Sequence, residues 1–417
     1  MRIKEIKARE ILDSRGNPTI RTTVTLHDGT TSSASVPSGA STGKFEAVEL
    51  RDNDKNRYGG KGVLSAVSNV NDVIAPQICS TDFSQHDLDN TLKAMDGSDN
   101  LKNLGANAVL SVSLAFARAA AKAENVPLFQ HLGNGAKLPV PMLNILNGGA
   151  HAANNLDIQE FMIMPVGFTK FSNALEASVS VYHNLGNLLR QKGLASTVGD
   201  EGGFAPDLKD EREAIELILE AIKLSGYNTE KDFKLALDMA ASEWKTDGGY
   251  FLPKKKLQLS TDEMIEYVEK LTIDYPIISV EDPLGEEDYD GFKTLTDKIG
   301  NRLQIVGDDL FVTNKSRLSD GIKEGYANAI LVKVNQIGTL TDALDTIHTA
   351  KGAAYKTIIS HRSGETADTF IADLAVALNA GQIKTGAPCR SERVEKYNRL
   401  LKIEEILSPF YFYGDLF

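Results

Sequence analysis

Six short apolar segments in the second half of the chain each end in a charged or catalytically capable side chain. These polar ends are Asp238, Glu281, Asp308, Lys333, His361 and Lys384. The intervals between them suit one strand, one helix and two short loops, which together make a βα unit. Repeated βα units close into a barrel whose functional residues lie at the carboxyl ends of the strands. Three carboxylates followed by basic side chains indicate a divalent-cation site facing a cationic wall, an arrangement that suits an anionic substrate.

The three acids Asp238, Glu281 and Asp308 are the predicted ligands of Mg²⁺, because this hard cation prefers carboxylate oxygens. Each acid taken singly can instead cap a helix or pair with a neighbouring base. Their common position at the ends of consecutive predicted strands favours the metal site over this structural alternative.

The basic residues that follow are candidates for proton transfer and anion binding. Lys333 ends 329-AILVKV-334, which is so apolar that we expect its amine to point into the barrel mouth. Burial near other cations would lower its pKa and free it as a base or Schiff-base nucleophile. A buried salt bridge to one of the carboxylates is the alternative. The string 360-SHRSGET-366 places Arg362 and Ser363 at a strand end before a helix, where an oxyanion such as phosphate can be held.

Two further acids lie earlier in the chain. Glu201 lies in 199-GDEGG-203, where glycines on both sides free the backbone, and Glu160 lies between apolar residues on a predicted inner strand. An acid inside a barrel is costly unless it is functional or paired. Two such carboxyls can share a proton, which raises the pKa of one and suits a general acid. Structural hydrogen-bonded acids are the alternative; His151, which follows two glycines, is expected on a nearby loop.

Composition limits the class of protein. A chain of 417 residues with 42% hydrophobic content suits a barrel with a smaller domain attached. A formal net charge of -12 argues against a nucleic-acid partner, and we expect 254-KKK-256 to be a solvated loop tip. Cys79 and Cys389 show no spacing typical of a disulfide or zinc site, so a reduced, cytoplasmic protein is expected. We find no apolar segment long enough to span a membrane.

The first part of the chain predicts a small α+β domain. Strands are expected over 3–12, 18–29 and 31–37, and helices over 62–79, 84–95 and 105–124. The last helix is almost entirely small or apolar and is expected to be buried between other elements. The Gly/Pro-containing connection 133-GNGAKLP-139 marks the expected boundary between domains 1–134 and 135–417.

The second part predicts a barrel with an irregular beginning. Two strands come first without a helix between them, then two helices, over 140–146, 158–165, 171–192 and 209–225. Regular strand–helix alternation begins only after these elements. One later helix opens with a capping box formed by Ser260 and Glu263.

Taken together, these segments resemble the enolase family of glycolytic lyases, in its bacterial type. The segments that carry the resemblance are 13-DSRGNPT-19, 37-PSGASTGKFEAVELRD-52, 144-NILNGGAH-151, 159-QEFMIMP-165, 198-VGDEGGFAP-206, 236-ALDMAASE-243, 280-VEDP-283, 306-VGDDLFVTN-314, 331-LVKVNQIGT-339, 360-SHRSGET-366 and 383-IKTGAP-388. The resemblance implies an α/β barrel of ββαα(βα)₆ order with a smaller N-terminal α+β domain. It also implies the reversible, Mg²⁺-dependent dehydration of 2-phosphoglycerate to phosphoenolpyruvate.

The resemblance assigns roles to individual residues. Asp238, Glu281 and Asp308 would hold a first Mg²⁺ and Ser41 would ligate a second, giving two ions per active site during turnover. The implied catalytic residues are Lys333 as the base at C2, Glu201 as the acid that assists loss of the C3 hydroxyl, its partner Glu160, and His151 and His361. The implied substrate contacts are His151, Glu160, Lys333, Arg362, Ser363 and Lys384, with Arg362 and Ser363 at the phosphate.

The partners implied by resemblance are a small phosphorylated carboxylate substrate and further copies of the chain, as a homodimer or an octamer of dimers. Secondary protein partners and a secondary surface or secreted location are implied by resemblance only. Three alternatives stay open at this stage: a metal-independent Schiff-base barrel aldolase, a related racemase, and a catalytically silent binding protein on the same fold. The racemase is disfavoured because 158-IQEFMIMP-165 offers no lysine on an early barrel strand.

Overall fold

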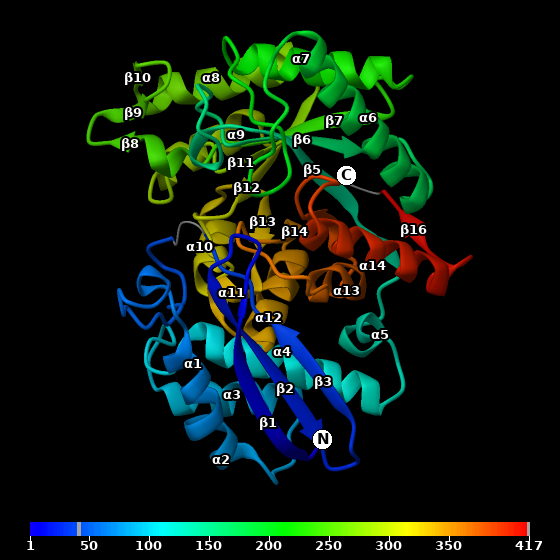
Figure 1. The fold of residues 1–417 in the computed structure, drawn as a ribbon. Helices are drawn as coiled ribbons and strands as arrows, with labels where there is room; N and C mark the ends of the chain where they lie inside the picture. Colours follow the sequence, from blue (N-terminus) through cyan, green and yellow to red (C-terminus); the bar gives the residue numbers. More distant parts are fainter. Residues whose placement is uncertain (40–42, 415–417) are drawn as a thin grey trace.

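The computed structural model describes residues 1–39 and 43–414. A three-stranded sheet with its helices forms an N-terminal domain, and an eight-stranded barrel forms the rest of the molecule (Figure 1). Ser41, the expected ligand of a second cation, lies outside the described residues. Within the described part of the chain, no helix combines the length and apolar character that crossing a membrane requires.

The N-terminal sheet is an antiparallel meander of β1 (Ile3–Leu12), β2 (Pro18–Leu26) and β3 (Thr31–Ser35). β2 and β3 are joined by a tight turn over residues 27–29. Gly29 there has a φ of 89°, and the Thr30 amide donates a 2.8 Å hydrogen bond to Asp28 Oδ1. A glycine adopts this left-handed backbone without the steric cost that a Cβ would add.

The helices of this domain pack against the sheet. Helix α4 (Ala106–Ala123) contacts β2 and β3 and is buried except near its C-terminal end, as its composition predicts. Helix α3 (Gln85–Asp96) also forms close to its predicted range. The single helix expected over 62–79 is wrong in detail: the segment divides into α1 (Leu64–Ser68), a π-helical turn η2 (Asn69–Ile74) and α2 (Ala75–Ile78). Within that turn, Asn71 forms two hydrogen bonds, of 2.8 and 3.1 Å, with the backbone of Ala8 on β1.

The barrel closes through eight strands, all in the described part of the chain. They are β5 (Val140–Asn147), β6 (Glu160–Pro165), β7 (Phe233–Asp238), β11 (Ile277–Glu281), β12 (Gln304–Gly307), β13 (Ala329–Val332), β14 (Lys356–Ser360) and β15 (Gly381–Lys384). β6 pairs antiparallel with both β5 and β7, whereas the other neighbours are parallel. The irregular beginning expected from the sequence is therefore confirmed.

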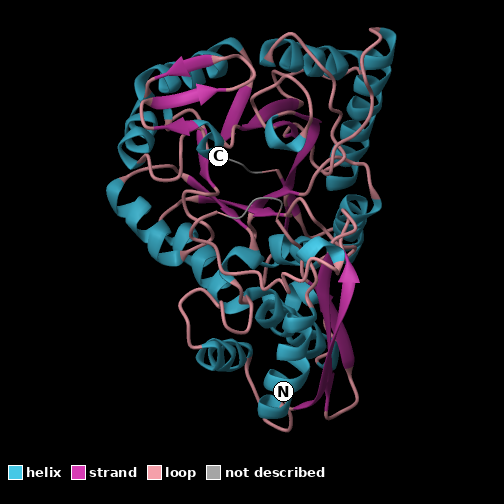
Figure 2. Ribbon diagram, turned by 60° about the vertical axis from the view of Figure 1, so that its left-hand side comes forward, coloured by secondary structure: helices cyan, strands magenta, loops and turns pink. Residues whose placement is uncertain are grey.

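Helices surround the barrel on its outside (Figure 2). In chain order the main ones are α6 (Phe171–Gln191), α7 (Glu211–Leu224), α8 (Thr261–Asp274), α9 (Tyr289–Ile299), α10 (Lys315–Glu324), α12 (Leu340–Gly352), α13 (Phe370–Ala377) and α14 (Ser391–Leu407). The two adjacent helices α6 and α7 complete the ββαα order. The capping box at the start of α8 is present, with Ser260 and Glu263 as its two members.

The interior of the barrel is packed rather than open. Side chains from several strands, among them Met142, Met164 and Leu331, form one buried apolar cluster. Close to them, Gln304 and Gln382 exchange two side-chain hydrogen bonds of 2.9 and 2.7 Å across the barrel. A buried amide pair that is satisfied in this way adds rigidity, because breaking it would leave polar groups unpaired. The strand ends above this layer are therefore held on a firm base.

A small three-stranded antiparallel sheet that was not predicted from the sequence follows β7. It consists of β8 (Lys245–Thr246), β9 (Gly249–Leu252) and β10 (Leu257–Leu259), and the turn between β9 and β10 contains 254-KKK-256. The expectation of a fully solvated tip is wrong for Lys255. Its ammonium pairs with the buried carboxylate of Glu211 and lies over the ring of Tyr267.

The N-terminal domain reaches the carboxyl ends of the barrel strands. Ser38 and Gly364 exchange two backbone hydrogen bonds of 2.8 Å each, which join the segment after β3 to the loop after β14. Arg118 of α4 also binds Asp368 through two hydrogen bonds of 2.7 Å. Residues of the N-terminal domain are thereby held at the barrel mouth.

Candidate active site

The three predicted metal ligands lie on one rim of the barrel. Asp238 and Glu281 are the last residues of β7 and β11 and are partners in the parallel register. Asp308 directly follows β12, the next strand. All three side chains are buried, so their charges are compensated by groups of the protein itself.

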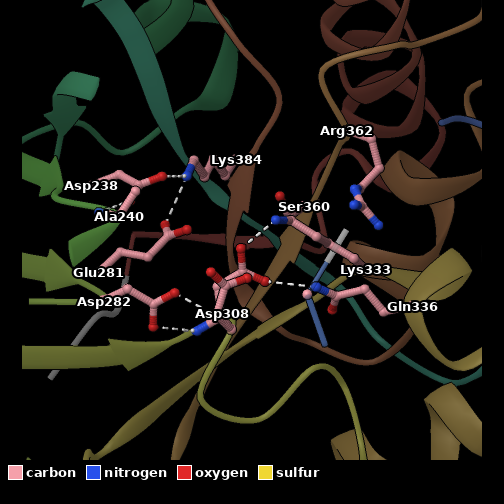
Figure 3. A network of polar contacts seen from close by, with 12 residues as sticks. Asp238, Ala240, Glu281, Asp282, Asp308, Lys333, Gln336, Ser360, Arg362 and Lys384 are labelled. Carbon is pink, nitrogen blue, oxygen red and sulfur yellow. Dashed lines mark hydrogen bonds and ion pairs between the residues drawn. The ribbon is translucent and has the colours of Figure 1, made fainter. Parts of the chain in front are cut away.

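The first compensating group is Lys384, the last residue of β15 and 2% exposed. Its amine lies 2.9 Å from Asp238 Oδ2 and 2.8 Å from Glu281 Oε2 (Figure 3). Glu160 Oε2 is 3.2 Å away. Burial acts to lower the pKa of Lys384, but the surrounding carboxylates outweigh it and raise the pKa well above its usual range.

The second compensating group is Lys333, which follows β13 and pairs with Asp308 Oδ2. Burial opposes ionisation of this amine, yet the charge of Asp308 raises its pKa above the usual value. The expectation of a lowered pKa is therefore wrong for this state, because the nearest group is an anion rather than another cation. Any cation that binds Asp308 would weaken the ion pair and lower the pKa of Lys333.

One oxygen at this rim has no hydrogen-bond partner in the structure. Glu281 Oε1 is buried and makes no hydrogen bond, although Oε2 of the same carboxyl binds Lys384. Burial and the charge of Asp238 raise the pKa of Glu281 well above its usual range. A buried, unpartnered carboxylate oxygen beside other carboxylates is suited to a hard divalent cation. The residues present therefore fit Mg²⁺.

Two further acids, Asp282 and Asp309, lie beside Asp308 and were not identified from the sequence. Asp282 Oδ1 and Oδ2 accept the amides of Asp308 and Asp309 at 3.0 and 2.8 Å. Ligand atoms of these three aspartates lie within 4.8 Å of one another. Burial and the charge of Asp308 raise the pKa of Asp309 to about 7. The signal in the sequence was the second acid directly after both Glu281 and Asp308.

Beside this rim, Glu160, Glu201 and His151 form a further cluster, and Glu160 is the register partner of Asp238 on the neighbouring strand. Glu160 begins β6, Glu201 lies in the loop 199–203, and His151 ends the short helix η3 (Gly149–His151). His151 Nδ1 lies 3.5 Å from Glu160 Oε1 and 3.9 Å from Glu201 Oε1. Asn144 of β5 donates a 2.9 Å hydrogen bond to Glu201 Oε2. The structure thus brings together three residues that the sequence placed on different elements.

The two carboxyls of this cluster have opposite proton affinities. Burial and the charge of Glu201 raise the pKa of Glu160 well above its usual range. Burial acts to raise the pKa of Glu201 as well, but the neighbouring rings of His361 and His151 bring it well below. Of the two carboxyls, Glu160 therefore has the higher affinity for a proton.

The predicted phosphate-binding residues follow β14. Arg362 is buried and donates hydrogen bonds of 2.9 and 3.3 Å to the two oxygens of Glu46 and one of 3.0 Å to Asn335 Oδ1. Glu46 comes from the segment after β3 and was not identified from the sequence. Ser363 lies next to Arg362 on the same cavity. An anion entering here would meet a guanidinium that is already oriented.

A further link joins the phosphate side to the metal side. Gln336 of the short helix α11 (Val334–Ile337) donates a 2.9 Å hydrogen bond to Asp308 Oδ1 (Figure 3). Its carbonyl oxygen accepts from Thr313, whose hydroxyl also accepts the amide of Lys333 at 2.9 Å. The side chain of Asp308 is therefore held on both oxygens.

Most of the predicted site residues line one cavity at the barrel mouth. These are His151, Glu160, Glu201, Asp238, Asp308, Lys333, His361, Arg362, Ser363 and Lys384. Glu281 joins them through its ion pair with Lys384. Ser41 falls outside the described residues, so its expected place at the site is not tested.

A larger hollow of about 830 Å³ lies between the N-terminal domain and the barrel. Two ion pairs line it, in which Arg118 binds Asp368 and Arg399 binds Asp373. No cluster of carboxylates with unmatched oxygens faces it among the described residues. The barrel mouth is therefore the better candidate for chemistry.

Comparison with known families agrees with the site and the fold. Residues 3–132 match the family described as "Enolase, N-terminal domain". Residues 135–415 match the family described as "Enolase, C-terminal TIM barrel domain". Together the two matches cover nearly the whole chain, and the closed eight-stranded barrel agrees with the TIM barrel that the second description names. The chain belongs to the enolase family.

Proposed function

We propose a division of roles among the residues of this chain for the enolase reaction, the reversible dehydration of 2-phosphoglycerate to phosphoenolpyruvate. The activity itself follows from family membership over both domains, which makes the protein a glycolytic lyase. The observation that carries the residue assignment is the convergence of two lysines and three strand-end carboxylates at the barrel mouth.

Asp238, Glu281 and Asp308 are proposed to hold Mg²⁺, the cation that the family uses. The bound cation would supply Lewis-acid stabilisation of the negative charge that develops on the substrate carboxylate. The unpartnered Glu281 Oε1 supports this assignment. A second Mg²⁺ per active site, with Ser41 among its ligands, is part of the same proposal.

Lys333 is proposed to remove the proton from C2. Its side chain is half-buried at the mouth and its amine is aligned by Asp308, so it becomes a base only when that ion pair is weakened. A carbon acid beside a carboxylate is very weak, so the positive charge of Lys384 also matters. Lys384 would stabilise the developing dianion more than the ground state.

Glu201 is proposed to protonate the departing C3 hydroxyl, with Glu160 and His151 as its partners. Glu160 has the higher proton affinity of the two carboxyls, and His151 Nδ1 lies 3.5 Å from Glu160 Oε1 and 3.9 Å from Glu201 Oε1. A proton bound by Glu160 would pass to Glu201 when the hydroxyl approaches. Lys333 and Glu201 come from different sides of the barrel mouth, which is the arrangement needed for a base and an acid that act on adjacent carbons.

Arg362 and Ser363 are proposed to bind the phosphate. His361 is proposed to help position Glu201, whose Oε2 lies 3.4 Å from Nε2 of the ring. Arg362 is fixed by Glu46, so the guanidinium loses little freedom when an anion binds. Family membership disfavours the Schiff-base aldolase, the racemase and the silent binding protein. Every lysine and carboxylate that the proposed mechanism requires is also present among the described residues.

The direct test is an absorbance assay for phosphoenolpyruvate formed from 2-phosphoglycerate, with Mg²⁺ and with EDTA. Turnover that requires Mg²⁺ supports the proposal. Turnover that is unaffected by EDTA, or trapping of the substrate on a lysine by borohydride, would overturn it in favour of Schiff-base chemistry.

We also propose a dimer or an octamer of dimers, a division into domains 1–134 and 135–417, and the bacterial type of the family. The free thiols of Cys79 and Cys389 are compatible with a cytoplasmic location. Light scattering on the purified protein would decide the oligomeric state.

A further inference from the structure

One buried arginine contacts two segments of the site and belongs to none of the roles described so far. Arg393 lies in the first turn of α14 and is 0% exposed. Its NH1 donates to His361 Nδ1 at 2.7 Å and to the Arg362 carbonyl at 2.6 Å. Its NH2 donates to the carbonyls of Ser363 and Asp200 at 2.7 and 3.1 Å.

These contacts determine which nitrogen of His361 carries a proton. A guanidinium has only donors, so the ring nitrogen that faces it must accept. Nδ1 is therefore unprotonated, and the single proton of the neutral ring lies on Nε2. Nε2 lies 3.4 Å from Glu201 Oε2. The His361 ring thus directs an N–H toward the proposed acid, although the two groups are not hydrogen-bonded in this state.

The same contacts oppose a second proton on the ring. The charged groups that face His361 are Glu201 from the loop 199–203, Lys384 from β15 and Arg393 from α14. Burial lowers the pKa of His361 to about 3, with the charge of Arg393 acting in the same direction and Glu201 against it. A proton on Nδ1 would also point directly at the guanidinium. The ring is therefore expected to stay neutral over the whole working pH range.

We propose that Arg393 is a positioning residue that locks His361 as a neutral donor toward Glu201 and ties the loop after β14 to the loop that carries Glu201. Its nearest carboxylate oxygen is Glu392 Oε1, 3.7 Å from Nε, so it is held mainly by carbonyls and the ring. An arginine with a purely structural role would usually face a carboxylate. The guanidinium of Arg393 instead faces the His361 ring and backbone carbonyls of the site. The kinetic part of this inference rests on the proposed role of Glu201, whereas the tautomer does not.

The decisive experiment is nitrogen NMR of the full-length protein with its histidine rings labelled with ¹⁵N, with and without Mg²⁺. The His361 signals would be assigned by their loss in His361→Gln, among the seven histidines of the chain. We expect an acceptor-type Nδ1 and a protonated Nε2 from pH 5 to pH 9. A proton on Nδ1, or titration of this ring within that range, would overturn the inference without any variant of Arg393 having to fold.

Arg393→Met provides the complementary test. We expect the pKa of His361 to rise in this variant, because the opposing charge of Arg393 is lost while burial of the ring remains. We expect kcat to fall by about 10²-fold with a smaller change in KM, because misplacement of a catalytic group by about 1 Å has an effect of this size. Exchange of the C2 proton with solvent should be reduced much less than dehydration, since Lys333 lies outside these contacts. Equal loss of both steps would indicate a merely structural role and would contradict the proposal.

Two further variants separate positioning from stability. Arg393→Lys keeps a donor for Nδ1 but cannot reach all the carbonyls, so it should retain the tautomer and recover part of kcat. Arg399→Met removes another arginine of α14, one that pairs with Asp373 instead. It should lower the unfolding temperature without changing the titration of the His361 ring. A shifted His361 titration in Arg399→Met, or an Arg393→Lys ring that behaves as in Arg393→Met, would refute the assignment.

Discussion

Replacing Lys384 with methionine should destabilise the metal-free protein strongly, because one amine compensates three buried carboxylates. Its distances to Glu281, Asp238 and Glu160 are 2.8, 2.9 and 3.2 Å. At an effective dielectric constant of about 20, each contact corresponds to about 5–6 kcal/mol of attraction before desolvation and carboxylate repulsion are subtracted. Removing one partner of a buried ion pair costs about 3–5 kcal/mol net. We therefore expect Lys384→Met to lower the free energy of unfolding by about 3–5 kcal/mol at pH 8 in EDTA.

The pH dependence of this loss has a definite sign. The pKa values of Glu160 and Glu281 are raised in the folded state and would be raised further without the amine. A carboxyl with a raised folded-state pKa binds more protons when folded than when unfolded, so stability falls as pH rises above about 4.3, the unfolded value. The gap between wild type and Lys384→Met should grow from pH 5 to pH 8 by up to about 1.4 kcal/mol per pH unit for each additional proton retained.

Urea unfolding followed through tryptophan fluorescence would measure this effect. Trp244 is the one tryptophan of the chain and is buried just after β7. Adding Mg²⁺ should narrow the gap, because a bound cation replaces the lost positive charge. Lys298→Met, which removes a surface ion pair with Glu269, is the matched control and should unfold like wild type. Equal midpoints in EDTA, or a gap that widens as pH falls, would refute the reasoning.

Three other predictions concern individual groups. Lys333→Ala should reduce turnover by at least about 10²-fold while Mg²⁺ binding, measured by calorimetry, is largely kept; more than a few per cent residual activity would contradict its role as base. Glu201→Gln should still exchange the C2 proton with deuterated solvent, detected by NMR, while dehydration falls by about 10²-fold or more; loss of exchange would require a different division of roles. Glu211→Leu should cost about 1–3 kcal/mol of stability and increase hydrogen exchange at Asp157, because Glu211 accepts that amide at 3.1 Å and pairs with Lys255; unchanged exchange there would show that the contact is dispensable.

Local sequence patterns predicted the barrel strands well. The runs that end at Asp238 and Glu281 coincide with the ends of β7 and β11. A parallel barrel strand is buried on both faces, so its sequence is a short run of apolar residues. The polar residue that ends this run lies at the rim of the barrel. The same rule placed Lys384 at the end of β15. The prediction of one helix over 62–79 was wrong. Hydrophobic periodicity carries no information about a side chain such as Asn71, which lies in the π-helical turn and binds a distant strand.

Protonation states could not be predicted in the same way. The lowered pKa expected for Lys333 is wrong, because the closest charge is Asp308 and not another lysine. Likewise, Glu46 and Arg393 showed no local signal as members of the site, since their partners Arg362 and His361 are distant in the chain. A pKa depends on charges within a few ångströms, and these come from segments that only folding brings together.

The amino-acid sequence by itself determined the kinds of chemistry available here: which residues end the strands, in what order, and hence a barrel mouth with acids on one side and bases on the other. Strand length and burial are local properties, and the pattern of apolar and polar residues encodes them directly. Tertiary structure alone decided which acid faces which base, which carboxyl has the higher proton affinity and which ring nitrogen is free to accept. Those properties arise from contacts between residues far apart in the chain, where electrostatic energy varies with distance and burial.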